Sequence, residues 1–472
     1  MRRSPDTRIV ILGAGPTGLG AAYRLRELGH EHFHVYERAD RVGGLATSYR
    51  DERGFTWDVG GHVQFSHYRY FDDLMTRSLG KAWLHHEREA WIWMERRFVP
   101  YPLQNNLHRL SPETRWKCVQ GLVRLYKQPC VGRPAHFGEW IDATFGAGLA
   151  EAFMRPYNFK VWAYPAERLD YNWIGERVAV TDLERVLDNL LHDRDDVSWG
   201  PNNTFQFPCH GGTGAIWREV ARLVGEERIS LGREVVAVDP RRREVRFADG
   251  SATGYDVLVS TIPIVELVAR AGLDELRPAA AQLLHSSSHI VGVGLAGRPP
   301  EALRRKCWMY FPEGDCPFYR VTVFSNYSPH NVPDPDAHWS LMAEVSESPH
   351  RPVAGCGVVA ATLDGLRATG LLGPEHEVVS CWHRREPFGY PTPALGRDTA
   401  LGALHRTLEA LDIYSRGRFG GWKYEVSNQD HSLMQGVELV NRLLLDVPEV
   451  TYWFPAIAND MRYAKRPASE RA

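Results

Sequence analysis

A glycine-rich turn between an aliphatic run and a helical pattern constrains the fold of this chain more than any other feature. Residues 9–12 (IVIL) predict a buried strand, and residues 13–18 (GAGPTG) follow it as G-x-G-x-x-G. Apolar residues then recur at helical spacing as far as Leu28, and residues 34–37 (HVYE) predict a second strand. This strand–helix–strand opening predicts an α/β fold built on a Rossmann-like, doubly wound parallel sheet.

The residue types in this opening suit a dinucleotide. Gly13 permits a tight turn, Gly15 lets the backbone approach a pyrophosphate, and Gly18 lets the helix pack closely. Glu37 follows Gly18 by 19 residues, at the end of the second strand, where its carboxylate can accept hydrogen bonds from ribose hydroxyls. Residues 41–46 (RVGGLA) add a second glycine pair and resemble the early segment of FAD proteins in the amine-oxidase-like superfamily. We therefore expect FAD rather than NAD.

Composition narrows the class of partner and the compartment. The 56 Lys and Arg residues nearly balance the 58 Asp and Glu residues, which argues against a nucleic-acid or membrane-surface partner. No apolar run approaches the roughly 18 residues that a membrane span needs. The seven cysteines form no C-x-x-C pair, and the histidines have no completed ligand set, so we expect no metal. A reducing cytoplasm fits this cysteine usage best.

Changes of pattern along the chain predict interleaved domains. We expect a Rossmann-like FAD-binding domain assembled from three pieces, a helical insertion that forms a substrate domain, and an antiparallel β-sheet domain. The expected boundaries are 1–95, 196–265 and 396–450 for the FAD-binding pieces, 96–195 for the helical domain, 266–395 for the sheet domain, and 451–472 for a C-terminal tail.

Several longer motifs have no generic flavoprotein meaning. They are residues 60–68 (GGHVQFSHY), 99–106 (VPYPLQNN), 153–162 (FMRPYNFKVW), 173–177 (WIGER), 200–202 (GPN), 316–320 (CPFYR), 326–329 (NYSP), 389–393 (GYPTP) and 422–432 (WKYEVSNQDHS). Together they closely resemble the eukaryotic-type UDP-galactopyranose mutases, from about residue 8 to residue 445. The resemblance implies an FAD-dependent isomerase of galactofuranose biosynthesis that interconverts a nucleotide-linked hexopyranose and hexofuranose without net redox chemistry.

The resemblance also implies how the reaction proceeds and which residues take part. Reduced FAD attacks the anomeric carbon and carries the sugar as a covalent flavin–sugar adduct while the nucleoside diphosphate is detached. The implied catalytic residues are Arg177 and Arg320, which clamp the diphosphate, and His62, which lies against the flavin. The implied substrate-binding residues are Tyr101, Gln104, Phe153, Asn158, Trp162, Asn202, Trp308, Tyr310, Tyr327, Tyr390, Tyr424 and Asn428. The expected cofactor-binding residues are Gly13, Gly15, Thr17, Gly18, Glu37, Gly43, Gly44, Leu45, Gly61, His62, Val236, Arg418, Asn428, Gln429 and Ser432.

Three departures from the family pattern leave the nucleotide open. Leu103 stands where the family usually has Phe, Gln206 replaces a usual Arg, and Gln64 replaces an aliphatic residue. A GDP-hexose such as GDP-galactose or GDP-fucose is therefore an alternative to the UDP-sugar. An amine-oxidase-like oxidoreductase and a non-catalytic nucleotide-sugar binder are further alternatives. NADPH or NADH is the expected reductant, and the sequence leaves the oligomeric state open, with a homodimer or homotetramer among the choices.

Overall fold

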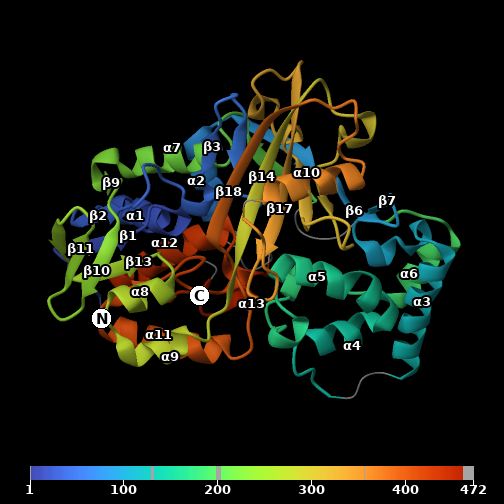
Figure 1. Cartoon of the computed structure of the whole chain (residues 1–472). Coiled ribbons are helices and arrows are strands. Elements are labelled where there is room, and N and C mark those ends of the chain that lie inside the picture. The colour runs from blue at the N-terminus through green and yellow to red at the C-terminus, as the bar shows by residue number, and fades with distance from the viewer. Residues whose placement is uncertain (1, 129–131, 198–202, 356, 461–472) are drawn as a thin grey trace.

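A five-stranded parallel sheet organises the nucleotide-binding part of the chain (Figure 1). The computed structural model describes residues 2–128, 132–197, 203–355 and 357–460. The strands, all parallel, run in the order β19 (Ile413–Ser415), β13 (Val257–Ser260), β1 (Ile9–Leu12), β2 (Phe33–Tyr36) and β9 (Ile229–Ser230). Segments from the start, middle and end of the chain thus share one sheet, and the predicted Rossmann-like fold is confirmed.

Alternate side chains of these strands enter two separate cores. Ile9 and Ile11 pack on one face of the sheet, whereas Val10 and Leu12 pack on the other. The first face is covered by α1 (Pro16–Glu27), α2 (Arg69–Leu79), α7 (Gly214–Val224) and α12 (Gln429–Leu445). The second is covered by α8 (Ile264–Arg270), α9 (Arg277–Ala280), α11 (Arg397–Ala410) and the small sheet of β10 (Val235–Asp239), β11 (Glu244–Phe247) and β12 (Ala252–Gly254).

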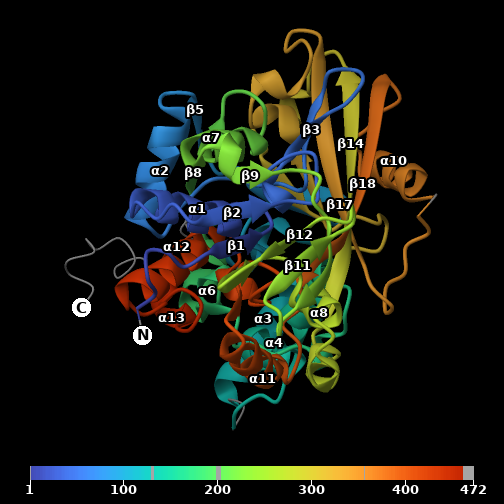
Figure 2. The same cartoon turned by 90° about the vertical axis from the view of Figure 1, so that its left-hand side faces the viewer.

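A second, seven-stranded sheet stands beside the first, with α10 (Val358–Ala368) packed on it (Figures 1 and 2). Its order is β18 (Val378–Pro391), β14 (His285–Ala296), β17 (His338–Glu347), β16 (Arg320–Val323), β15 (Trp308–Tyr310), β6 (Ala90–Met94) and β7 (Arg97–Pro100). All neighbours are antiparallel except β15 and β6, which are parallel. Two-stranded sheets pair β3 (Ser48–Arg50) with β4 (Thr56–Asp58) and β5 (Trp83–Glu87) with β8 (Thr204–Pro208).

The predicted helical insertion lies at the lower right of Figure 1, next to β6 and β7 and away from the parallel sheet. It contains α3 (Pro112–Lys127), α4 (Phe137–Leu149), α5 (Arg155–Trp162) and α6 (Leu183–Leu191), and a π-helical turn (Ala150–Met154) joins α4 to α5. Ser111 caps α3 and Asp182 caps α6 through side-chain oxygens, which satisfies first-turn N–H groups. A short helix, α13 (Pro455–Ala458), lies near the end of the described chain. Among the described helices, none is long and apolar enough to cross a membrane.

Candidate active site

A cavity of about 470 Å³ opens where the two large sheets meet. Its lining includes Leu12, Tyr36 and Thr261, which lie at or just beyond the carboxyl ends of β1, β2 and β13. Ser288 of β14 and Glu344 of β17 line it from the seven-stranded sheet. The carboxyl edge of an open parallel sheet is the usual place for a ligand, so this cavity is the candidate active site.

Two helix N-termini face the cavity and suit a diphosphate. Gly15 at the start of α1 and Asn428 at the start of α12 leave the first-turn N–H groups without a side-chain cap. Such groups and the helix dipoles attract negative charge. Gly13 has a φ of +100°, and a Cβ on Gly18 would lie 1.9 Å from the Gly13 carbonyl oxygen, so both positions require glycine. The arrangement fits the pyrophosphate of FAD.

Most of the predicted cofactor residues surround this cradle. The cavity lining includes Gly13, Gly15, Thr17, Glu37, Gly44, Leu45, Gly61, His62, Arg418, Asn428, Gln429 and Ser432. The carboxylate of Glu37 is held by the N–H groups of Ala14, at 2.8 Å, and Ala39, at 2.9 Å. The cofactor role of Val236 stays a prediction: its side chain is 49% exposed, whereas its neighbour Val235 lines the cavity, because alternate strand residues point to opposite faces.

Several polar atoms in the cavity wall are buried without a partner among the described residues. They are His62 Nδ1, Gln64 Nε2 and Ser288 Oγ. Buried polar atoms cost free energy unless they are hydrogen-bonded, so these three mark where a polar ligand ring would bind. Burial, with a smaller contribution from the charges of Arg418 and Arg320, lowers the pKa of His62 to about 4 against the opposing effect of Glu344. His62 is therefore neutral at physiological pH and can both donate and accept a hydrogen bond.

Arg320 is fixed by a buried carboxylate that the sequence analysis did not single out. Its Nε and Nη2 donate to the two oxygens of Glu344 at 2.7 and 2.8 Å. Glu344 also accepts from the Tyr319 hydroxyl, at 2.8 Å, and from the Gly61 N–H, at 3.1 Å. Although burial opposes it, the charge of Arg320 and these hydrogen bonds hold the pKa of Glu344 below its usual value. Arg320 is thereby held against the segment that carries His62.

Three predicted arginines surround the rings of Tyr390 and Tyr424 and are named here the cationic group: Arg177, Arg320 and Arg418. The guanidinium of Arg418 lies 4.9 Å from the ring centre of Tyr390, and that of Arg177 lies 4.9 Å from the ring centre of Tyr424. The two tyrosine rings are 5.9 Å apart. Arg177 also donates from Nη2 to the Glu425 carbonyl, at 2.8 Å, and its Nη1 lies 3.5 Å from Asn428 Oδ1. Burial raises the pKa of Tyr390. The positive charge of nearby Arg320 acts in the opposite direction.

The remaining predicted substrate residues form an aromatic wall next to this group. The Tyr310 ring is 5.2 Å from Tyr101 and 5.4 Å from Tyr157, and Tyr157 stacks on Phe153 at 5.3 Å. Trp162 lies 4.8 Å from Tyr424. In addition, Trp308 Nε1 donates to the Tyr310 hydroxyl, as expected for residues on one strand face. The wall can accept a flat ring such as a nucleobase.

Some predicted side chains are already engaged or lie elsewhere. Gln104 donates to the Ala179 carbonyl, and Asn158 donates to the Met154 carbonyl at 2.7 Å. Tyr327 is fully buried, and its ring contacts those of Phe205, Phe207 and Trp308. Asn202 lies outside the described residues. Leu103 is buried in the core of the helical insertion.

Glu344, Tyr319 and Tyr157 are the site residues that sequence reasoning missed. Glu344 did carry a signal, because it is a charged residue inside the otherwise apolar run 341–345 (LMAEV), where an unpaired charge would be costly. Tyr157 lies four residues after Phe153, the spacing at which helical side chains meet. Tyr319 directly precedes Arg320 in the motif 316–320 (CPFYR), and that position was its only signal.

The absence of a metal stays a prediction. Among the described residues, two groups have possible ligand atoms within 4.8 Å of one another: Cys209 with His210 and His330, and His67 with Asp430 and His431. In the second, Asp430 accepts from His67 Nδ1 at 2.7 Å and lies 3.2 Å from His431 Nδ1. The hydrogen bonds from the backbone N–H and the ring of His67 satisfy the buried carboxylate without a metal.

Comparison with known proteins first identifies the nucleotide-binding part. Residues 11–77 match the NAD(P)-binding Rossmann-like domain. The chain is 36% identical over 75 residues to a zeta-carotene desaturase of Capsicum annuum, covering 16% of this chain and 13% of that protein. It is 46% identical over 58 residues to an L-amino acid oxidase of Cerastes cerastes, covering 12% and 11%. The matched segments are thus a small part of these curated relatives.

Solved structures match over nearly the whole chain. The crystal structure of reduced UDP-galactopyranose mutase superposes with a TM-score of 0.94 and 47% identity, covering 96% of this chain and 97% of that one. A fatty acid isomerase from P. acnes gives a TM-score of 0.64 with 16% identity, covering 93% and 99%. Putrescine oxidase bound to putrescine gives 0.62 with 17% identity, covering 93% and 99%. At such identities the last two show a shared fold alone.

Proposed function

The chain belongs to the UDP-galactopyranose mutase family, and on that premise we propose that it interconverts UDP-galactopyranose and UDP-galactofuranose. As a member of the family it is an FAD-dependent isomerase. The observation that carries the proposed substrate is the convergence of Arg177, Arg320 and Arg418 on Tyr390 and Tyr424, between the FAD cradle and an aromatic wall. Fixed guanidinium groups match the oxygens of a diphosphate.

FAD, when bound and reduced, supplies a nucleophilic ring nitrogen for the anomeric carbon of the sugar. Gly13, Gly15 and the N-terminus of α12 hold its pyrophosphate, and Glu37 holds the adenosine ribose. His62, which is neutral because burial lowers its pKa to about 4, would exchange hydrogen bonds with a bound flavin without adding charge. NADPH or NADH is the expected reductant of the cofactor.

The arginines act on the leaving group. Negative charge grows on the diphosphate as its bond to the sugar breaks, and donors held at that position lower the barrier. Arg320 is fixed by Glu344 before the substrate arrives, so the enzyme need not reorganise it during the reaction. The same contacts retain the detached nucleotide until the sugar has reclosed as the other ring form. The aromatic wall of Tyr101, Phe153, Tyr157 and Tyr310 holds the base.

A direct assay tests the reaction. Dithionite-reduced protein is incubated with UDP-galactofuranose, and formation of UDP-galactopyranose is followed by chromatography and NMR. The R177A variant should retain FAD and lose about 100-fold or more in turnover, since removing one transition-state donor typically costs 2.7–4 kcal/mol. The R298A variant is the matched control, because Arg298 is exposed and pairs only with Asp336 at the surface. Wild-type turnover by R177A would contradict the assigned role.

Two alternatives are decided by companion measurements. Leu103, Gln64 and Gln206 depart from the usual family residues, so a GDP-hexose is tested by titrating GDP and UDP against a fluorescent nucleotide bound to the protein. Binding of GDP with no effect of UDP would overturn the uridine assignment. An amine-oxidase-like reaction would consume one equivalent of acceptor for each product, whereas the proposed mutase stays reduced over many turnovers.

A further inference from the structure

The last described segment of the chain runs from the end of α12 back to the active site. Residues 446–460, named here the C-terminal strap, follow α12 and include α13. The motifs that carry the resemblance in the sequence end near residue 445, so the sequence analysis gave this segment no role, although the match to the solved mutase structure covers 96% of the chain. The strap is nevertheless buried at several points, with Glu449 2%, Thr451 0% and Tyr452 0% exposed.

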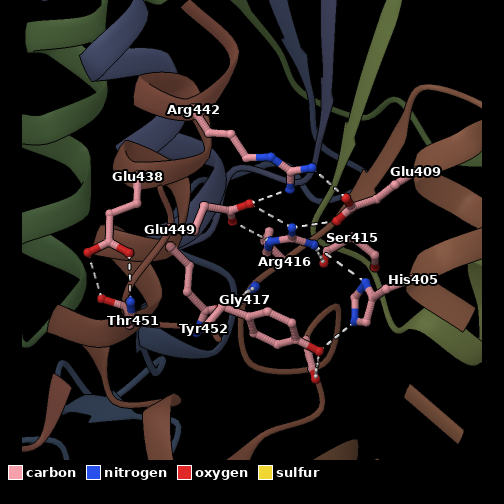
Figure 3. A network of polar contacts seen from close by, with 12 residues as sticks. His405, Glu409, Ser415, Arg416, Gly417, Glu438, Arg442, Glu449, Thr451 and Tyr452 are labelled. Carbon is pink, nitrogen blue, oxygen red and sulfur yellow. Dashed lines mark hydrogen bonds and ion pairs between the residues drawn. The ribbon is translucent and has the colours of Figure 1, made fainter. Parts of the chain in front are cut away.

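Buried charged and polar contacts fasten the first half of the strap (Figure 3). Arg416, fully buried, donates to the two carboxylate oxygens of Glu449 from Nε, at 2.6 Å, and from Nη2, at 2.8 Å. Arg442 of α12 adds a contact to Glu449 at 2.8 Å. Glu438 accepts from the N–H and the hydroxyl of Thr451 at 2.7 and 2.9 Å. Breaking such a buried pair is costly, so the strap is held in one place on α12.

The next contacts carry the strap to the turn beside the substrate arginines. The Tyr452 hydroxyl lies against His405 and donates to the Gly421 carbonyl at 3.1 Å (Figure 3). Lys423 donates from Nζ to the Tyr452 carbonyl at 3.1 Å. Lys423 immediately precedes the 3-10 turn Tyr424–Val426, which α13 contacts. The strap thus meets the turn that carries Tyr424.

One carbonyl of that turn joins the strap to Arg177. The Glu425 carbonyl accepts from Arg177 Nη2 at 2.8 Å and from Asn459 Nδ2 at 3.2 Å. The Glu425 side chain is itself fixed, since its oxygens accept from buried Arg397 at 2.6 and 2.9 Å. Asn459 Nδ2 also donates to the Pro455 carbonyl, at 2.9 Å, which locks the amide on α13. Arg177 Nε and Asn459 Oδ1 are both buried and have no hydrogen-bond partner among the described residues.

We propose that the C-terminal strap positions Arg177 for the diphosphate of the nucleotide sugar, and that Asn459 is the positioning residue. The inference rests on the proposed function in one respect, namely that Arg177 binds that diphosphate. The neutral Glu425 carbonyl orients Arg177 without cancelling its charge, in contrast to Arg320, which a carboxylate holds. Asn459 fixes the carbonyl from the other side, so that the Arg177 guanidinium keeps one orientation before the substrate arrives.

A double-mutant cycle on nucleotide affinity tests the inference. FAD-loaded wild-type protein, N459A, R177A and the N459A/R177A double variant are titrated with UDP, or with GDP if the competition experiment above favours it. N459A should weaken binding about three- to tenfold, the effect of one net hydrogen bond. It should have no further effect once Arg177 is absent, because Asn459 acts through Arg177. I457A is the matched control on the same short helix, since Ile457 is 41% exposed and should leave binding unchanged.

The outcomes separate positioning from general stabilisation. N459D keeps the shape of the side chain but cannot donate to Glu425, so it should weaken binding at least as much as N459A while FAD content and thermal midpoint match those of I457A. Equal losses from N459A in the presence and absence of Arg177, or wild-type affinity in N459A and N459D, would overturn the positioning role. Wild-type affinity in R177A would instead overturn the diphosphate role of Arg177 itself, and the inference with it.

Discussion

Removal of the Arg320 guanidinium should lower two quantities, turnover and the free energy of unfolding, by different physical routes. Turnover falls because the departing diphosphate loses a fixed donor, at a cost of about 2.7–4 kcal/mol or 100- to 1,000-fold. Stability falls because R320A leaves Glu344, which is only 3% exposed, as a buried charge. Two charge-assisted hydrogen bonds at 2.7 and 2.8 Å are lost, each worth about 1.5–3 kcal/mol. The sum agrees with the roughly 3–5 kcal/mol typical of a broken buried pair.

The double variant R320A/E344Q separates the two routes. The glutamine keeps the shape of Glu344 and removes its charge, so the buried-charge penalty disappears and most of the lost stability should return. Turnover should stay low, because the guanidinium is still absent. Urea denaturation of the FAD-bound proteins measures the first quantity, and conversion of UDP-galactofuranose by reduced protein measures the second. Stability of R320A equal to that of the wild type, or no recovery in the double variant, would refute this reasoning.

Two further predictions concern the flavin side of the cavity. Burial lowers the pKa of His62 from its ordinary value near 6.5 to about 4, so the unfolded chain binds a proton between these pH values that the folded chain does not. The thermal midpoint should therefore fall as the pH drops from 6.5 towards 4, and it should fall less steeply in H62N. An equal dependence of the midpoint on pH in H62N and the wild type would contradict this prediction. A Cβ at Gly18 would lie 1.9 Å from the Gly13 carbonyl, so G18A should lose FAD on purification, measured by absorbance, whereas G402A, which meets open space on α11, should retain it.

The part of the FAD cradle around α1 was predictable from the sequence because its elements are consecutive, whereas the N-terminus of α12 comes from the far end of the chain and was expected only through the family resemblance. Strand β1, the turn at Gly13 to Gly18 and helix α1 are consecutive, and the acidic residue at the end of β2 follows at a fixed spacing. Backbone geometry alone dictates glycine at Gly13 and Gly18. The strand at Val235–Asp239 was also expected, but the face that each of its residues presents depends on how β10 packs against α8, so the outward side chain of Val236 was not foreseen.

The cationic group could be predicted only through resemblance. Arg177, Arg320 and Arg418 come from a 3-10 turn, a strand and a loop, and no spacing rule brings them together. Arginine is also common in this chain, so its presence alone selects nothing. The contact between Asn459 and the Glu425 carbonyl is harder still to foresee, because it depends on the path of the C-terminal strap over α12.

The charges around the substrate tyrosines are matched to a diphosphate rather than to an apolar amine. Arg177, Arg320 and Arg418 bring three positive charges to this group, against the one negative charge of Glu344, which is paired with Arg320. Glu425 adds nothing to the sum, because Arg397 neutralises it at 2.6 Å. A sugar nucleotide carries two negative phosphates that these guanidinium groups can pair with, whereas an amine would add a further positive charge beside them. Putrescine oxidase shares the fold of this chain, so the substrate class follows from these side chains rather than from the sheets.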